Sequence, residues 1–257
     1  VRGRLTFRPD RSTRLTVGNL TVMDGGTIEI GTEAQPVRAD VTAEVVIADQ
    51  PINAAIDPDQ IGTGLQGLGV IRMHGAVKTP TFVRLAEEPT AGATSLVLDA
   101  AVSGWLAGDV LVVPDTRQLR EAQRGPDFQS QDEAVRVAAV EGARVVLQAP
   151  LRFEHRGART PDGRVEFLPH VGNVTRNVVL RSENPAGTRG HTIFVNRADV
   201  DIRYVEFREM GRTRMGVLDN TTYDEHGQVA HMGDNQIGRY AIHLHHDFGP
   251  ATTPSNG

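Results

Sequence analysis

Short runs of apolar residues, bounded by Gly, Pro, Asn or Asp, recur along this chain. Typical runs are EVVI at 44–47, DVLVV at 109–113, NVVLRS at 177–182 and DIRYVEF at 201–207. Where apolar and polar residues alternate within such a run, the period of two is typical of a β-strand. One stretch, TRQLREAQRG at 116–125, has a helical composition, but it lacks a clean apolar face and we expect a loop. The pattern therefore predicts an all-β protein.

Three strands in the last third of the chain start alike, at residues 178–180, 200–202 and 240–242. The first two begin about 22 residues apart, which suits one coil of a parallel β-helix. The third comes later, so we expect residues 211–236 to form a loop that protrudes from one coil. Loops of this kind commonly build a binding face.

The composition of the chain excludes several classes of function. The 257 residues carry a formal net charge of −5, which argues against nucleic-acid binding through a general basic field. The chain has no cysteine, so disulfides and thiolate metal sites are excluded. Its apolar runs fall short of the roughly 18 residues that a membrane span needs. The basic residues are nearly all Arg, which suggests a GC-rich bacterial genome, and the Val start and PSNG end suggest a piece of a longer protein.

The segment GRYAIHLHHDFG at 238–249 holds the most distinctive chemistry. Strand alternation sends Ile242 and Leu244 to one face and His243 and His245 to the other. Two neighbouring imidazoles on an outer face suit acid–base catalysis near pH 7.

The same two histidines could instead bind a divalent metal, calcium or a transition metal, together with Asp247. A structural ladder of stacked histidines is the alternative. We expect His246 to be packed and hydrogen-bonded rather than catalytic.

Two more side chains are candidates for the same chemistry. Glu206 alternates with Val205 and Phe207, so it points outward and is the best carboxylate for a hydrolase. An ion pair with an Arg of the next coil is the alternative. His191 is predicted about two coils before His243, roughly 10 Å away, and could contact the same ligand.

Arginines make the second region locally basic. We expect Arg203, Arg208 and Arg239, with Tyr240, to bind substrate, because Arg binds carboxylates through paired hydrogen bonds. Charge balance against nearby Asp and Glu is the alternative. The polar loop 218–235 contains Asp, Glu and His, but it lacks the regular spacing of a calcium loop.

The chain as a whole resembles proteins with a G8 domain followed by a parallel β-helix. This family includes the cell-migration-inducing and transmembrane hyaluronidases and the fibrocystin-like proteins. For the G8 part, the resemblance is carried by GGTIEIGTE at 25–33, GVIRMHG at 69–75, AGDVLVV at 107–113 and APLRFEH at 149–155. For the β-helix it is carried by RGHTIF at 189–194, VEFREMG at 205–211 and IGRYAIHLHH at 237–246.

This resemblance implies a G8-like β domain over residues 1–160. It further implies the first coils of a right-handed, pectin-lyase-like parallel β-helix over residues 161–257. Because an open coil end would expose unpaired backbone, we expect further coils or a cap to follow.

The resemblance also implies a secreted or cell-surface protein that cleaves or binds a hyaluronan-like anionic glycan in a β-helix groove. If it is an enzyme, a glycosidase or a polysaccharide lyase is expected. The alternatives are a non-catalytic glycan-binding or adhesion module of a large bacterial surface protein, or a stalk with structural histidines. No nucleic-acid partner is expected.

Overall fold

The computed structural model describes residues 1–249. They form strands and turns with one short 3-10 turn, η1 (Glu121–Gln123), and contain no α-helix. The all-β prediction is therefore confirmed. The chain divides into two compact units, which we call unit one (residues 1–76 and 176–257) and unit two (residues 77–175).

Unit one is built from three parallel sheets. The first sheet contains β1 (Arg4–Phe7), β4 (Thr27–Ile30), β7 (Val70–His74) and β18 (Asp199–Arg203). The second contains β2 (Thr13–Val17), β5 (Ala43–Ile47), β16 (Val178–Ser182) and β19 (Val205–Arg208). The third contains β3 (Asn19–Val22), β6 (Gly64–Gly67), β17 (His191–Asn196) and β22 (Leu244–Asp247).

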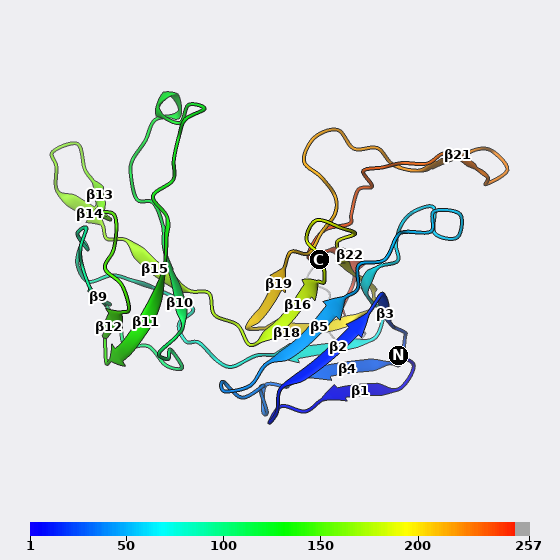
Figure 1. The fold of residues 1–257 in the computed structure, drawn as a ribbon, viewed down its shortest axis with the longest axis horizontal. Coiled ribbons are helices and arrows are strands. Elements are labelled where there is room, and N and C mark those ends of the chain that lie inside the picture. Colours follow the sequence, from blue (N-terminus) through cyan, green and yellow to red (C-terminus); the bar gives the residue numbers. More distant parts are fainter. Residues whose placement is uncertain (250–257) are drawn as a thin grey trace. The chain divides into compact units, whose positions relative to one another are not determined.

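Within each of these sheets, neighbouring strands are parallel, and the chain visits the three sheets in turn. This is the topology of a parallel β-helix. Figure 1 shows β2, β5, β16 and β19 side by side although they come from distant parts of the sequence. The long connection before β22 carries the small hairpin of β20 (Thr222–Tyr223) and β21 (Val229–His231).

The coils differ from the sequence-based expectation in place and length. The first coil begins at β1, so the parallel helix starts near the beginning of the chain and not at residue 161. The predicted boundary after residue 160 falls inside unit two, which the chain inserts between β7 and β16. Val178 pairs with Val205, so this coil takes 27 residues instead of about 22. The strands at 178 and 200 look alike but belong to different sheets.

The interior of unit one is filled by side chains in register on successive coils. Leu20 pairs with Leu65, and Val22 pairs with Gly67, which in turn pairs with Phe194. The Phe194 ring is fully buried, and a Cβ on Gly67 would lie 2.6 Å from it. Gly67 therefore leaves the space that this large side chain needs in a close-packed interior.

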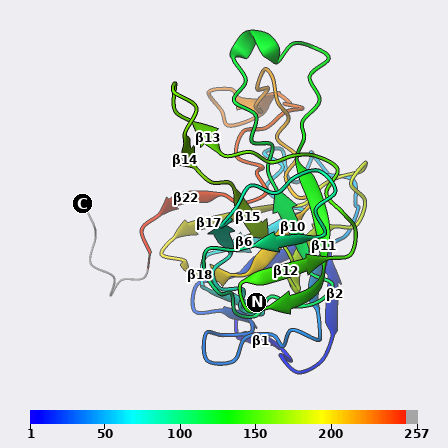
Figure 2. The same cartoon turned by 90° about the vertical axis from the view of Figure 1, so that its left-hand side faces the viewer.

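Unit two is an antiparallel sheet with its own core. In order across the sheet, the strands are β8 (Phe82–Arg84), β15 (His170–Asn173), β10 (Val110–Val113), β11 (Glu133–Glu141), β12 (Arg144–Leu147) and β9 (Ser95–Val97). A hairpin of β13 (Ala158–Arg159) and β14 (Val165–Phe167) follows the sheet. Figure 2 shows β10, β11 and β12 side by side, with η1 in the long connection between β10 and β11. Trp105 is buried in this core.

Candidate functional site

The histidines of the 238–249 segment lie on the outer face of the third sheet. Leu244 of β22 pairs with Phe194, which points into the core, and His245 pairs with Val195. Side chains alternate along a strand, so His243 and His245 point away from the interior. Ile242 and Leu244 are exposed rather than buried, because β22 is the edge strand of its sheet in the described chain.

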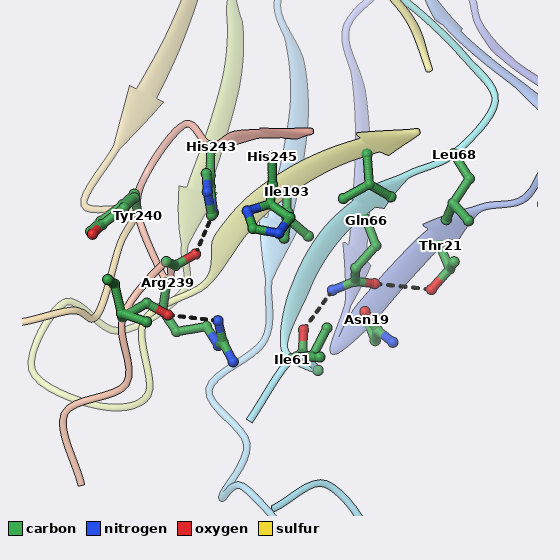
Figure 3. A pocket seen from close by; sticks show the side chains of 14 residues that line it. Asn19, Thr21, Ile61, Gln66, Leu68, Ile193, Arg239, Tyr240, His243 and His245 are labelled. Atoms are coloured by element: carbon green, nitrogen blue, oxygen red, sulfur yellow. Dashed lines mark hydrogen bonds between the residues drawn. The ribbon is translucent and has the colours of Figure 1, made fainter. Parts of the chain in front are cut away.

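A pocket of about 740 Å³ lies over this outer face. Parallel register places outward side chains in a row, in which Thr21, Gln66 and Ile193 come from β3, β6 and β17. Further walls come from the segments 61–62 and 237–240 and from the two histidines. Figure 3 shows Tyr240, His243 and His245 on one side of the pocket and Thr21 and Leu68 on the other. We call this space the β-helix pocket; it is lined by Asn19, Thr21, Ile61, Gly62, Gln66, Leu68, Ile193, Val195, Ile237, Gly238, Arg239, Tyr240, His243 and His245.

The amide of Gln66 is held in one orientation. Its Oε1 accepts a hydrogen bond from Thr21 Oγ1 at 2.9 Å, and its Nε2 donates to the Ile61 carbonyl at 3.0 Å. The polar part of the β-helix pocket is therefore pre-formed, which lowers the ordering cost of binding.

The histidine rings form a continuous aromatic row with Tyr240. Ring centroids are 5.3 Å apart for Tyr240 and His243, and 5.1 Å apart for His243 and His245, both edge to face. His243 Nδ1 donates to the Gly238 carbonyl at 2.8 Å, which leaves Nε2 as an acceptor in the neutral ring. Loss of solvation, with smaller contributions from His246 and His243, lowers the pKa of His245, so this ring is neutral at pH 7.

His246 contradicts the expectation that it is packed. It lies at a bulge where β22 shifts register, its φ is +47°, and its side chain is exposed. The extra residue of a bulge changes the direction of the side chain, which alternation alone does not predict. The ring stacks on His245 at 4.3 Å.

His191 does not line the β-helix pocket. It lies one coil before β22, not two, and its side chain is fully buried. Its Nε2 donates to the Ile61 carbonyl at 2.8 Å, and its Nδ1 has no hydrogen-bond partner within residues 1–249. Burial, together with the charge of Arg212, lowers its pKa to about 4. A sugar chain cannot reach this ring.

The predicted carboxylate and two of the predicted arginines lie on other sheets. Glu206 and Arg208 belong to β19 and pair with each other at 2.7 and 2.8 Å. Arg203 belongs to β18 and forms ion pairs with Asp201 and Glu33. The structure therefore does not bring Glu206, Arg203 or Arg208 together with His243.

Arg239 is in the β-helix pocket, but three of its five N–H donors are bonded to backbone carbonyls. Nε donates to the Gln60 carbonyl at 3.0 Å, Nη1 to the Ile237 carbonyl at 2.8 Å, and Nη2 to the Asp59 carbonyl. It ties the segment around residue 60 to the last coil. This role was not predicted, because a sequence gives no indication that an Arg donates to distant backbone carbonyls.

The expected metal site is not assembled. Within residues 1–249 no three His, Asp or Glu side chains come together as a metal would require. Asp247 follows the bulge and accepts a hydrogen bond from the Gly249 amide at 3.0 Å. In the loop 218–235, His231 pairs with Asp219 at 2.6 Å.

As for membrane spans, the described part of the chain has no helix that is long and apolar enough to be a candidate.

The fold and pocket define a parallel β-helix protein with a polar and aromatic pocket on one face, and residues 1–86 match the model of the G8 domain. The match ends well before the predicted residue 160. Fibrocystin-L of Mus musculus is 28% identical over 274 residues, which covers 95% of this chain and 6% of that protein. Fibrocystin of Canis lupus familiaris is 27% identical over 194 residues, with 71% of this chain and 4% of that protein covered. The resemblance to fibrocystin-like G8 proteins is confirmed.

Among solved structures, the chain is similar to two phage tailspikes. For Gp54 of Acinetobacter baumannii bacteriophage AP22, solved in complex with capsular saccharide, the TM-score is 0.29 at 13% identity, covering 81% of this chain and 29% of that chain. For gp61 of Pseudomonas phage phi297, the TM-score is 0.31 at 14% identity, covering 75% and 26%. At these scores the likeness carries no argument about function.

Proposed function

We propose that this chain is a glycan-binding module that holds a short segment of a polysaccharide in the β-helix pocket. The observation that carries the proposal is the pocket's lining. An aromatic row of Tyr240, His243 and His245 faces a fixed Gln66 amide across apolar side chains. Sugars present both apolar faces and hydroxyl groups, and a small-molecule site commonly combines an apolar lining with a few fixed polar groups. Its volume is within the range of about 300–1,000 Å³ that is usual for ligand sites.

Binding is favoured over hydrolysis because the β-helix pocket has no Asp or Glu among its lining residues in the described chain. Most glycosidases use two carboxyl groups on either side of the scissile bond. Glu206, the best candidate from the sequence, is on a different sheet and pairs with Arg208.

The charge of the β-helix pocket favours a neutral sugar segment. Arg239 is its one cationic lining residue within residues 1–249, and each of its three nitrogens donates to a backbone carbonyl. These bonds use three of the five N–H donors of Arg239, so a uronate would find at most one free N–H on each Nη. A hyaluronan-like polymer would therefore bind through its uncharged sugar faces. A module of this kind would act outside the cell or at its surface, where long polysaccharides are met.

A polysaccharide lyase is the second candidate. A lyase removes a proton next to a uronate carboxyl group, so it needs a neutral base and a group that stabilises the anion. The lowered pKa of His245 suits the base. Three of the five N–H donors of Arg239 are already bonded to backbone carbonyls, so it is poorly placed to stabilise the anion, which is why binding is preferred.

We expect the substitution Tyr240→Ala to weaken glycan binding about tenfold or more, because it removes the stacking face. Binding would be measured by calorimetry with glycans first selected on an array of neutral and acidic polysaccharides. The double variant His243→Ala/His245→Ala should give a similar loss.

Tyr223→Ala is the matched control. Tyr223 is 43% exposed and Tyr240 is 41% exposed, but Tyr223 lies in the β20–β21 hairpin and does not line the pocket. Equal losses for both Tyr variants, or no binding to any glycan on the array, would contradict the proposal. Depolymerisation that is lost in the double His variant would instead favour the lyase.

A further inference from the structure

Unit two has a separate pocket, of about 510 Å³, that gathers four arginines. We call it the arginine pocket; it is lined by Ala91, Thr116, Arg117, Gln118, Gln131, Arg152, Phe153, Glu154, Arg156, Gly157 and Arg159. The arginines come from the segment after β10 and from the segment between β12 and β14. Glu154 is the only carboxylate among the lining residues of the described chain.

Carboxylates behind the lining hold three of these four arginines in place, through the backbone or through the side chain. Glu133 accepts hydrogen bonds from the backbone N–H of Arg152 at 2.8 Å and of Phe153 at 2.9 Å. The buried His155 lies against the same carboxylate, with Nε2 at 3.0 Å. These bonds lower the pKa of Glu133 against the opposing effect of burial, so it stays ionised at neutral pH.

Two further carboxylates orient the side chains themselves. Asp115 accepts hydrogen bonds from Nε and Nη2 of Arg117, and Glu88 accepts one from Nη2 of Arg159 at 2.8 Å. Both carboxyl groups have a lowered pKa, chiefly because of these arginine bonds. An arginine whose position is fixed in this way loses less conformational freedom when it binds a ligand.

Several guanidinium donors remain unused. Arg159 Nη1 is buried and has no hydrogen-bond partner in the described chain. Arg152 reaches Glu133 only through Nε, at the long distance of 3.4 Å. The contact of Arg156 with Glu154 is through Nε, at 2.9 Å. For Arg152 and Arg156, no bond from either Nη atom is found within residues 1–249. A buried donor without a partner is costly, and a bound acceptor would satisfy it.

The exposure of the charges makes the surface of this pocket positive. The side chains of Arg152 and Arg156 are 71% and 65% exposed, whereas those of Glu133 and Asp115 are 3% and 13% exposed. The charges of Glu133 and Asp115 thus lie behind the positive ones, whereas Glu154, whose side chain is 44% exposed, lies in the lining beside Arg156. Phe153 adds an aromatic ring, with the Arg152 guanidinium carbon 5.0 Å from its centroid.

We propose that the arginine pocket binds an oxyanion group carried on a sugar-sized ring, with the open Nη edges of Arg152 and Arg156 and Nη1 of Arg159 donating to it. Carboxylate, sulfate ester and phosphate ester share the chemistry that pairs with an arginine fork. Phe153 would contact the ring. The proposal rests on unit two alone and is independent of the proposed function of the β-helix pocket.

The test uses the whole chain and four sugars of one ring size: glucuronate, glucose 6-sulfate, glucose 6-phosphate and uncharged glucose. Ligand-observed NMR titrations at about 150 mM salt limit general charge attraction. We expect at least one anionic sugar to bind about tenfold or more tightly than glucose. The double substitution Arg152→Gln/Arg156→Gln should remove that preference, and the best-bound sugar identifies the oxyanion.

Arg164→Gln is the control, because Arg164 is exposed, pairs with Asp162 and does not line the pocket. Its binding should equal that of the unsubstituted chain. Anionic sugars that bind no better than glucose would overturn the proposal, as would equal losses in the control and the double variant. Tyr240→Ala should leave this binding unchanged, so failure here and failure of the β-helix pocket are distinguishable.

Discussion

Acidification from pH 7 to pH 4 is expected to remove about 3 kcal/mol of stability through His191 alone. Burial lowers the pKa of this ring from 6.5 to about 4 in the folded chain. Between these two values the unfolded chain binds a proton that the folded chain does not. Stability therefore falls as the pH decreases through this window and becomes independent of His191 below about pH 4. The stability that depends on a neutral His191 ring is fully present above pH 6.5.

The substitution His191→Gln isolates this effect. At pH 7 the variant should be less stable, because it disturbs the bond to the Ile61 carbonyl. Its deficit relative to the unsubstituted chain should shrink by about 3 kcal/mol between pH 7 and pH 4, since Gln does not titrate. Hydrogen exchange of the β17 amides in urea measures the free energy of unfolding of unit one directly.

His226→Gln is the control, because His226 is an exposed histidine of the β20–β21 hairpin. Its stability should follow that of the unsubstituted chain at every pH. A deficit of His191→Gln that stays constant from pH 7 to pH 4 would contradict the folded-state pKa of His191.

The sequence predicts strands well, but it does not predict their order in space. Short apolar runs bounded by Gly, Pro, Asn or Asp place β5, β10 and β16 at nearly the expected residues. Such runs occur in a parallel coil and in an antiparallel sheet alike, so residues 4–74 could not be distinguished from the strands of unit two. Ala43 pairs with Val178 across the inserted unit, and no local pattern signals such a partner.

The candidate site was also only partly predictable, because it combines residues of one strand with residues of distant strands. Alternation along one strand correctly places His243 and His245 outward. Thr21, Gln66 and Ile193 join them only through the register of three distant strands. The single-residue bulge at His246 and the burial of His191 depend on tertiary packing, which a linear pattern does not contain.

The largest single effect is expected from Lys78→Met, which should destabilise unit two by about 3–5 kcal/mol. Lys78, the only Lys of the chain, is buried, and its Nζ lies 2.9 and 2.7 Å from the two oxygens of Asp109. Removing it leaves an uncompensated buried carboxylate, because the remaining partners of Asp109, Asn173 Nδ2 and the Leu106 amide, are uncharged. Trp105, the only Trp, is buried in unit two, so its fluorescence reports this unfolding transition.

Two further variants separate the buried charge from lost packing. Lys78→Met/Asp109→Leu removes both charges, so it should recover much of the stability that Lys78→Met loses. Arg84→Met breaks the exposed pair with Asp99 in the same sheet and should cost less than about 1 kcal/mol. If the double variant were as unstable as Lys78→Met, the loss would come from packing and the uncompensated charge would not be its cause. If Lys78→Met cost no more than Arg84→Met, the pair would not be buried in solution.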